Sequence, residues 1–124
     1  AERVAQMNTN SVSCTATFIQ DAGVAALDGA WDDVREMIGE FKARRDLAVE
    51  ELNQIPGISC VQPQGAFYAF PNAAEAIRRR GLADDLALSE LLLNEAEVAV
   101  VPGSAFGAPG YIRLSFACSL DTLK

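Results

Sequence analysis

Arg113 has the residue type and the position to bind a ligand, because it stands between Ile112 and Leu114 in the apolar segment YIRLSFA, residues 111–117. A planar guanidinium can hold a carboxylate through two parallel hydrogen bonds. Side chains alternate between the two faces of a strand, so Ile112, Leu114 and Phe116 share one face. The opposite face carries Tyr111, Arg113, Ser115 and Ala117. That face is either exposed to solvent or borders a cleft in which Arg113 grips a carboxylate, and the spacing alone allows both.

The sequence offers few residues for nucleophilic catalysis or for metal binding. The sequence contains no histidine, so neither a cysteine nor a serine nucleophile has its usual base. Cys14, Cys60 and Cys118 are odd in number and widely separated, which is typical of reduced thiols in the cytoplasm. We therefore expect no metal site and a cytoplasmic location.

Two further segments could border a site. VPGSAFGAPG, residues 101–110, lacks the Gly-Lys-Ser/Thr ending of a phosphate loop, and it indicates a rigid connector with glycines at positive φ. QGAFYAF, residues 64–70, is either a core strand with Gly65 as a turn residue or the wall of a pocket.

The surrounding pattern predicts an α+β fold. Helical spacing indicates a buried helix from residue 15 or 16 to about 27 and a long amphipathic helix over 31–55. Strands are expected over 58–62 and 66–70, paired as a hairpin, with a helix over 85–96. Further strands are expected over 97–103 and 111–117. This order predicts a small mixed or antiparallel sheet covered by helices on one face.

Size and charge limit the function. The 124 residues suit a single domain, and the net charge of -7 disfavours nucleic acid and anionic membranes as partners. We expect no membrane span. The sequence starts without an initiator Met, and Ser119 could cap a helix that has no room to form, so we expect a fragment of a longer protein.

Several segments in this order resemble one enzyme family: PQGAFYAF (63–70), EVAVVPGSAFGAPG (97–110) and YIRLSFACS (111–119). NTNSVSCTATFIQDAGVAAL (8–27) and KARRD (42–46) also fit it. The sequence is similar to the C-terminal, small-domain part of fold-type I, pyridoxal-phosphate-dependent aminotransferases of class I/II, the group that contains the bacterial aspartate aminotransferases. The resemblance implies a small domain over 31–124, led by a long connector helix. It also implies that 1–30, with one helix, lies at the boundary of the large domain and the dimer.

The resemblance also implies roles for individual residues. Arg113 falls on the arginine that binds the substrate α-carboxylate, Phe67 on a residue of the substrate pocket, and Gly65 on a turn at its edge. Ser13 falls on a contact to the neighbouring subunit's site. The parent is then a homodimer that uses pyridoxal 5'-phosphate to move an amino group between an amino acid and a 2-oxo acid.

One departure from the family concerns the lysine that forms a Schiff base with the cofactor. The sequence has only Lys42, within a helical pattern, and the terminal Lys124, and neither lies in the family's lysine motif. We therefore expect no catalytic residue in this chain, no cofactor bound to it alone, and no activity without the missing large domain. Two alternatives stay open: another activity of the same fold type, lyase or synthase, and a non-catalytic interaction module.

Overall fold

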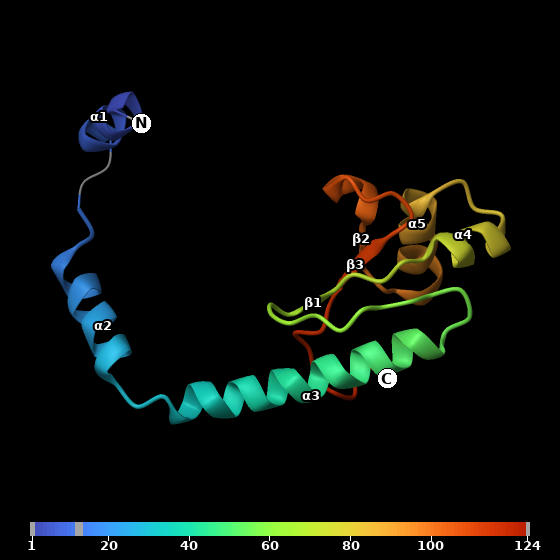
Figure 1. The fold of residues 1–124 in the computed structure, drawn as a ribbon, viewed down its shortest axis with the longest axis horizontal. Helices are drawn as coiled ribbons and strands as arrows, with labels where there is room; N and C mark the ends of the chain where they lie inside the picture. The colour runs from blue at the N-terminus through green and yellow to red at the C-terminus, as the bar shows by residue number, and fades with distance from the viewer. Residues whose placement is uncertain (1, 12–13, 124) are drawn as a thin grey trace. The chain divides into compact units, whose positions relative to one another are not determined.

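The computed structural model describes residues 2–11 and 14–123, and the chain divides into two compact units, Ala1–Arg35 and Glu36–Lys124 (Figure 1). The second unit contains the whole sheet and every site residue predicted above except Ser13. Ser13 lies outside the described residues.

The described residues of the first unit form two helices, α1 (Glu2–Ser11) and α2 (Thr17–Asp28), where the sequence predicted one. The pattern for α2 was confirmed, but its predicted burial was wrong. None of its residues is buried, and Phe18 and Leu27 are each 73% exposed. An apolar composition favours burial, but burial also requires a surface that covers the helix.

The predicted long helix is confirmed as α3 (Asp32–Gln54). Its first turn carries Asp32 and Asp33, whose charges suit the positive end of a helix dipole. The helix ends just before the Pro56–Gly57 pair, which cannot continue it. In its second half Ala48 is 4% exposed and packs into the core.

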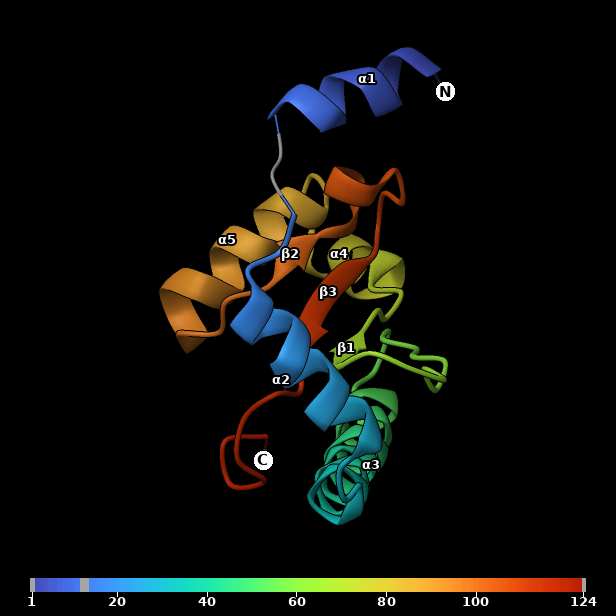
Figure 2. The same ribbon diagram turned by 90° about the vertical axis from the view of Figure 1, so that its left-hand side faces the viewer.

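In the described part of the chain, the sheet has three short antiparallel strands: β1 (Tyr68–Ala69), β2 (Val101–Pro102) and β3 (Ile112–Ser115). Their order in the sheet is β1-β3-β2. Figure 2 shows β3 between the other two strands. Tyr68 pairs with Ser115, and Val101 pairs with Arg113. The α+β class and the small sheet are thus confirmed, and Arg113 lies on the central strand.

The predicted hairpin between 58–62 and 66–70 is wrong. Ser59 forms an isolated bridge with Asn72, and β1 pairs with β3 instead. Pro63 has no amide hydrogen for a ladder bond, and the central strand β3 accepts partners on both edges. The strand predicted over 97–103 is reduced to β2. Glu97, in a left-handed conformation (φ 56°), caps the preceding helix, and η1 (Gly103–Phe106) begins directly after β2.

Helices α4 (Ala74–Arg80) and α5 (Asp85–Ala96) lie on one side of the sheet (Figures 1 and 2). The predicted helix over 85–96 is confirmed. Side chains from β3 enter two apolar clusters: Ile112 packs with α4 and α5, and Phe116, just beyond the strand, packs with α3. Both are almost fully buried, at 4% and 1% exposed. Alternation along β3 therefore turns Arg113 away from the helices.

Two other features complete the fold. The Ser119 hydroxyl accepts a hydrogen bond from the Thr122 amide (3.2 Å), and a turn forms there instead of a helix. No helix in the described part of the chain is long and apolar enough to cross a membrane.

Candidate functional site

Arg113 is half-buried, and two aromatic rings contact it. The guanidinium carbon lies 4.4 Å from the ring centroid of Tyr68 and 4.5 Å from that of Phe106. Each contact is a cation–π interaction, which is favourable and also restricts where the side chain can point. Among the described residues no carboxylate forms an ion pair with Arg113. The sequence left open a solvated face or a binding face. This arrangement favours binding, because the planar group is held while none of the described residues accepts a hydrogen bond from its N–H donors.

Further aromatic rings surround this pair of contacts. Phe70 stacks on Tyr111 at 5.2 Å between centroids and meets Phe106 edge-on at 6.0 Å. We call the group of Tyr68, Phe70, Phe106, Tyr111 and Arg113 the arginine–aromatic cluster. It joins β1, the segment after β1, the loop between β2 and β3, and β3 itself, so only the folded sheet brings it together.

Backbone hydrogen bonds and two glycines at positive φ shape the loop that carries Phe106. It begins with the 3-10 turn η1 (Gly103–Phe106) and returns at Gly110. Gly107 and Gly110 have φ values of 73° and 83°, as the prediction of glycines at positive φ required. The Gly103 amide donates to the Tyr111 carbonyl (2.7 Å), which ties the loop's start to its end.

Phe67 and Gly65 line a separate cavity of about 490 Å³ between α3 and residues 64–67. Phe67 is 41% exposed, and its carbonyl accepts a hydrogen bond from the Phe116 amide (3.0 Å). A Cβ at Gly65 would have no heavy atom within 4 Å, so the fold does not require glycine there. Arg113 does not line this cavity, but the Phe67 ring lies 4.5 Å from the Tyr68 ring that contacts it. The structure thus places the three predicted residues near one another without one shared cavity.

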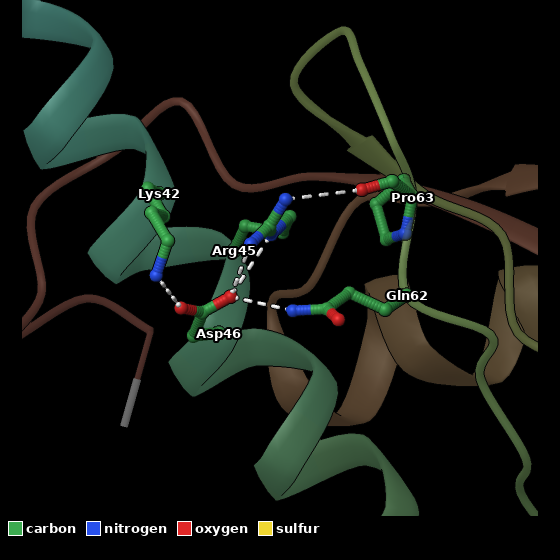
Figure 3. A network of polar contacts seen from close by, with 5 residues as sticks. All are labelled: Lys42, Arg45, Asp46, Gln62 and Pro63. Carbon is green, nitrogen blue, oxygen red and sulfur yellow. Dashed lines mark hydrogen bonds and ion pairs between the residues drawn. The ribbon is translucent and has the colours of Figure 1, made fainter.

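A polar network ties α3 to the segment that leads into this cavity (Figure 3). The Asp46 carboxylate accepts hydrogen bonds from Lys42 (3.0 Å), Arg45 (2.7 Å) and Gln62 (2.7 Å). Arg45 also donates to the Pro63 carbonyl at 3.4 Å. Hydrogen bonds from Lys42 and then Arg45 lower the pKa of Asp46 to about 2, so the carboxylate is ionised at neutral pH. The network anchors residues 62–63 on the helix and engages Lys42 in an ion pair.

Another cavity, of about 540 Å³, lies on the opposite face of β3 from Arg113. Ile112 and Leu114 contribute to its mainly apolar lining, together with side chains of α3, α4 and α5. Arg79 and Arg80 also line it, and the Arg79 guanidinium is bonded to Glu75 at 2.7 Å. A binding site needs a few converging polar groups besides apolar walls, and the Arg113 face meets that need better.

The remaining predicted residues do not add to this site. Cys60 is buried, and burial raises the pKa of its thiol, which leaves it a poor nucleophile. Groups of three or more potential metal ligands are absent among the described residues. Lys124, like Ser13, lies outside those residues.

Tyr68, Phe70 and Phe106 were not singled out from the sequence, although all three lie in the two segments that it indicated as possible borders of a site. A signal existed for Tyr68, because Arg113 and Ser115 share a face, and Tyr68 is the cross-strand partner of Ser115. That signal became readable only once β1 was paired with β3. Phe106 belongs to a loop, and no periodicity indicates where a loop side chain points.

The family profile and the sequence relatives of this chain all point to one family. A profile of the aminotransferase class I and II family matches residues 1–124. The chain is 50% identical to the probable aspartate/prephenate aminotransferase of Aquifex aeolicus over 99% of its own length and 31% of the relative's. It is 46% identical to the aspartate aminotransferase of Geobacillus stearothermophilus, covering 94% of the chain and 30% of that relative.

Solved structures agree. The chain matches the aspartate aminotransferase of Rhizobium meliloti with a TM-score of 0.84 and 38% identity, over 96% of the chain and 31% of that structure. It matches an aromatic aminotransferase from Pyrococcus horikoshii with a TM-score of 0.84 and 44% identity, over 98% of the chain and 32% of that structure. The chain therefore spans about a third of the length of these relatives.

Proposed function

The chain belongs to the class I and II aminotransferases, and we propose that within a longer enzyme it forms the small domain that binds the substrate α-carboxylate. The observation that carries this proposal is Arg113, a half-buried guanidinium that contacts two rings and has no carboxylate partner among the described residues. The parent then transfers an amino group between an amino acid and a 2-oxo acid. Both substrates carry the carboxylate that Arg113 would hold.

The residue type suits this role. Two parallel hydrogen bonds from a guanidinium fix both the distance and the plane of a carboxylate. A substrate held in this way presents its Cα–H bond in one orientation, which lowers the entropic cost of proton removal. A lysine would hold the same charge with less control of the plane.

The family implies pyridoxal 5'-phosphate in the full-length enzyme, where it acts as the electron sink of the reaction. The described residues of this chain do not suit its attachment. The Lys42 Nζ lies 3.0 Å from an Asp46 oxygen, on an exposed stretch of α3. We therefore assign the cofactor-holding lysine to the missing large domain and propose that this chain alone is inactive.

The finer features of the proposal rest on the family resemblance. Phe67 and Gly65 belong at the edge of the substrate pocket, and Ser13 at the neighbouring subunit's site. The parent is a cytoplasmic homodimer, and the large domain of the same polypeptide is this chain's first partner.

The proposal is tested in the full-length parent with Arg113→Ala and Arg113→Lys. Removing one partner of a desolvated charge pair costs about 2 to 5 kcal/mol, so kcat/KM for L-aspartate should fall by roughly 30-fold to several thousandfold in Arg113→Ala. Arg113→Lys should retain part of the activity. The matched control is Arg78→Ala, whose exposed guanidinium pairs with Glu75 and should be dispensable.

An unchanged kcat/KM in Arg113→Ala would rule out the carboxylate-binding role. The claim about the cofactor has its own test, in which the 124-residue chain is incubated with pyridoxal phosphate and reduced with borohydride. Stoichiometric labelling of Lys42 would contradict the assignment of the cofactor lysine to the missing part.

A further inference from the structure

Asp85, the first residue of α5, is a buried carboxylate with no role in the site as described so far. Its exposed fraction is 2%, and it is the one charged residue that is buried among those the structure describes. Its Oδ2 atom accepts a hydrogen bond from the backbone amide of Ser104 at 2.7 Å. The bond joins residues 19 positions apart, so it ties α5 to η1.

The surroundings of Asp85 favour its charged form. The Ser104 amide is the main cause of a lowered pKa, and the Ser104 hydroxyl and the Gly110 backbone add to it. Asp85 forms no ion pair with a basic side chain in the described chain. Its charge is therefore balanced by the two ends of the Phe106 loop and by the N-terminal dipole of α5.

The neighbouring acid, Asp84, already performs the local task of a helix start. Its side chain accepts a hydrogen bond from the Ala87 amide (2.8 Å), as an N-cap residue does. Asp85 is therefore not needed as the cap, and its bond to Ser104 points to a task outside its own helix.

That task concerns the placement of Phe106. Two of the loop's other hydrogen bonds are internal: Gly107 donates to Ser104 (3.1 Å), and Ala108 donates to Gly103 (3.0 Å). At the far end the Gly110 carbonyl accepts a hydrogen bond from the Ala73 amide (2.8 Å), just before α4. These bonds set the shape of the loop and hold its far end, but not where it lies against α5. The Phe106 ring is 49% exposed, so burial alone holds it weakly.

We propose that Asp85 is a positioning residue for substrate binding: by holding the Ser104 amide, it places the Phe106 ring against Arg113 and so sets the orientation of the guanidinium. The proposal rests on the proposed function, because Arg113 must bind the substrate carboxylate for its orientation to matter. Ser104 and Phe106 are two residues apart in η1, and the ring centroid lies 4.5 Å from the guanidinium carbon. A shift at Ser104 is therefore passed to Arg113 over a short path.

The test uses Asp85→Asn in the full-length enzyme loaded with its cofactor, with L-aspartate as the probe in single-turnover reactions. The amide keeps the size of the side chain but removes the charge that orders the loop ends. Since a misplacement of 1 Å can cost about 100-fold, we expect the half-saturating aspartate concentration to rise by about 5- to 50-fold. The maximal rate should fall as well, because the same guanidinium also fixes the orientation of the Cα–H bond in the bound substrate.

Asp84→Asn is the matched control, since it makes the same chemical change one residue away and asparagine is an equally good N-cap. It should leave both parameters unchanged. Phe106→Leu should raise the half-saturating aspartate concentration, as Asp85→Asn does. The double variant should be less impaired than the product of the single effects, because both changes act on the same contact. A merely structural role would lower the melting temperature without this coupling.

The outcomes separate the two proposals. If Arg113→Ala leaves half-saturation unchanged, the proposed function fails and the positioning role fails with it. If Arg113→Ala impairs binding while Asp85→Asn behaves like Asp84→Asn, the positioning role alone is overturned. If Asp85→Asn does not fold, Phe106→Leu provides the test. An unchanged half-saturating aspartate concentration in Phe106→Leu then overturns the positioning role.

Discussion

Gly103 should be the least replaceable glycine of the loop that carries Phe106. A Cβ placed there would overlap the Ala108 carbonyl oxygen and would lie 2.7 Å from the Tyr111 Cβ. Real Cβ contacts are not this short, and the overlapped oxygen belongs to the backbone, which cannot rotate away. Gly103→Ala must therefore open the loop and weaken the bond between the Gly103 amide and the Tyr111 carbonyl (2.7 Å).

The magnitude follows from two opposing effects. Overpacking of a tight site costs up to about 3 kcal/mol. Replacing glycine by alanine also restricts the unfolded chain, which returns about 0.4 to 1 kcal/mol. We expect a net loss of about 2 kcal/mol in the free energy of unfolding. With a urea m-value of about 1.5 kcal/mol per molar, the unfolding midpoint should fall by about 1.3 M.

Gly65→Ala is the matched control, because the same methyl group meets no heavy atom within 4 Å at that position. Its free energy of unfolding should stay within about 0.5 kcal/mol of the wild type. Urea unfolding followed by circular dichroism compares the two variants directly. If Gly103→Ala and Gly65→Ala unfold at the same urea concentration, the close approach at Gly103 does not constrain the loop.

Three further outcomes are expected. The pKa of Asp46 is about 2 in the folded chain against its ordinary 3.8, so its carboxylate stabilises the fold above about pH 4 and loses this effect as the pH falls towards 2. The difference in urea midpoint between the wild type and Asp46→Asn should shrink over that range, and a constant difference would contradict the network in Figure 3. Asp84→Ala should lower the free energy of unfolding by about 1 kcal/mol through loss of the N-cap, while Asp84→Asn should not. Iodoacetamide should label exposed Cys14 fastest, Cys118 more slowly and buried Cys60 only after unfolding, as peptide mass mapping can check.

Helices were predictable because their signals are local. The spacing of apolar residues predicted α3, and the amphipathic pattern of residues 85–96 predicted α5 with its bounds. Because these signals are local, the predicted burial of α2 was wrong: its composition indicated burial, but none of its residues is buried. Periodicity reports which face of an element is apolar, and a covering surface has to come from elsewhere in the protein.

Strand pairing was not predictable in the same way. Residues 58–62 and 66–70 have strand-like composition and lie close in sequence, which favoured a hairpin. In the fold, β1 pairs with β3, more than 40 residues later in the numbering, and Ser59 bridges to Asn72. A strand's hydrogen-bonding groups are the same whatever its side chains are, so the choice of partner depends on how the helices and the sheet pack together.

For the site, the sequence by itself determined the residue type at Arg113 and the face of the strand on which it lies, because alternation along a strand is a property of the backbone. Only the tertiary structure decided which side chains contact Arg113 on that face. Tyr68 arrives through the pairing of β1 with β3, and Phe106 arrives on a loop whose place depends on the buried Asp85 carboxylate. These contacts join residues far apart in the chain, and chain folding has to close those distances before any of them can form.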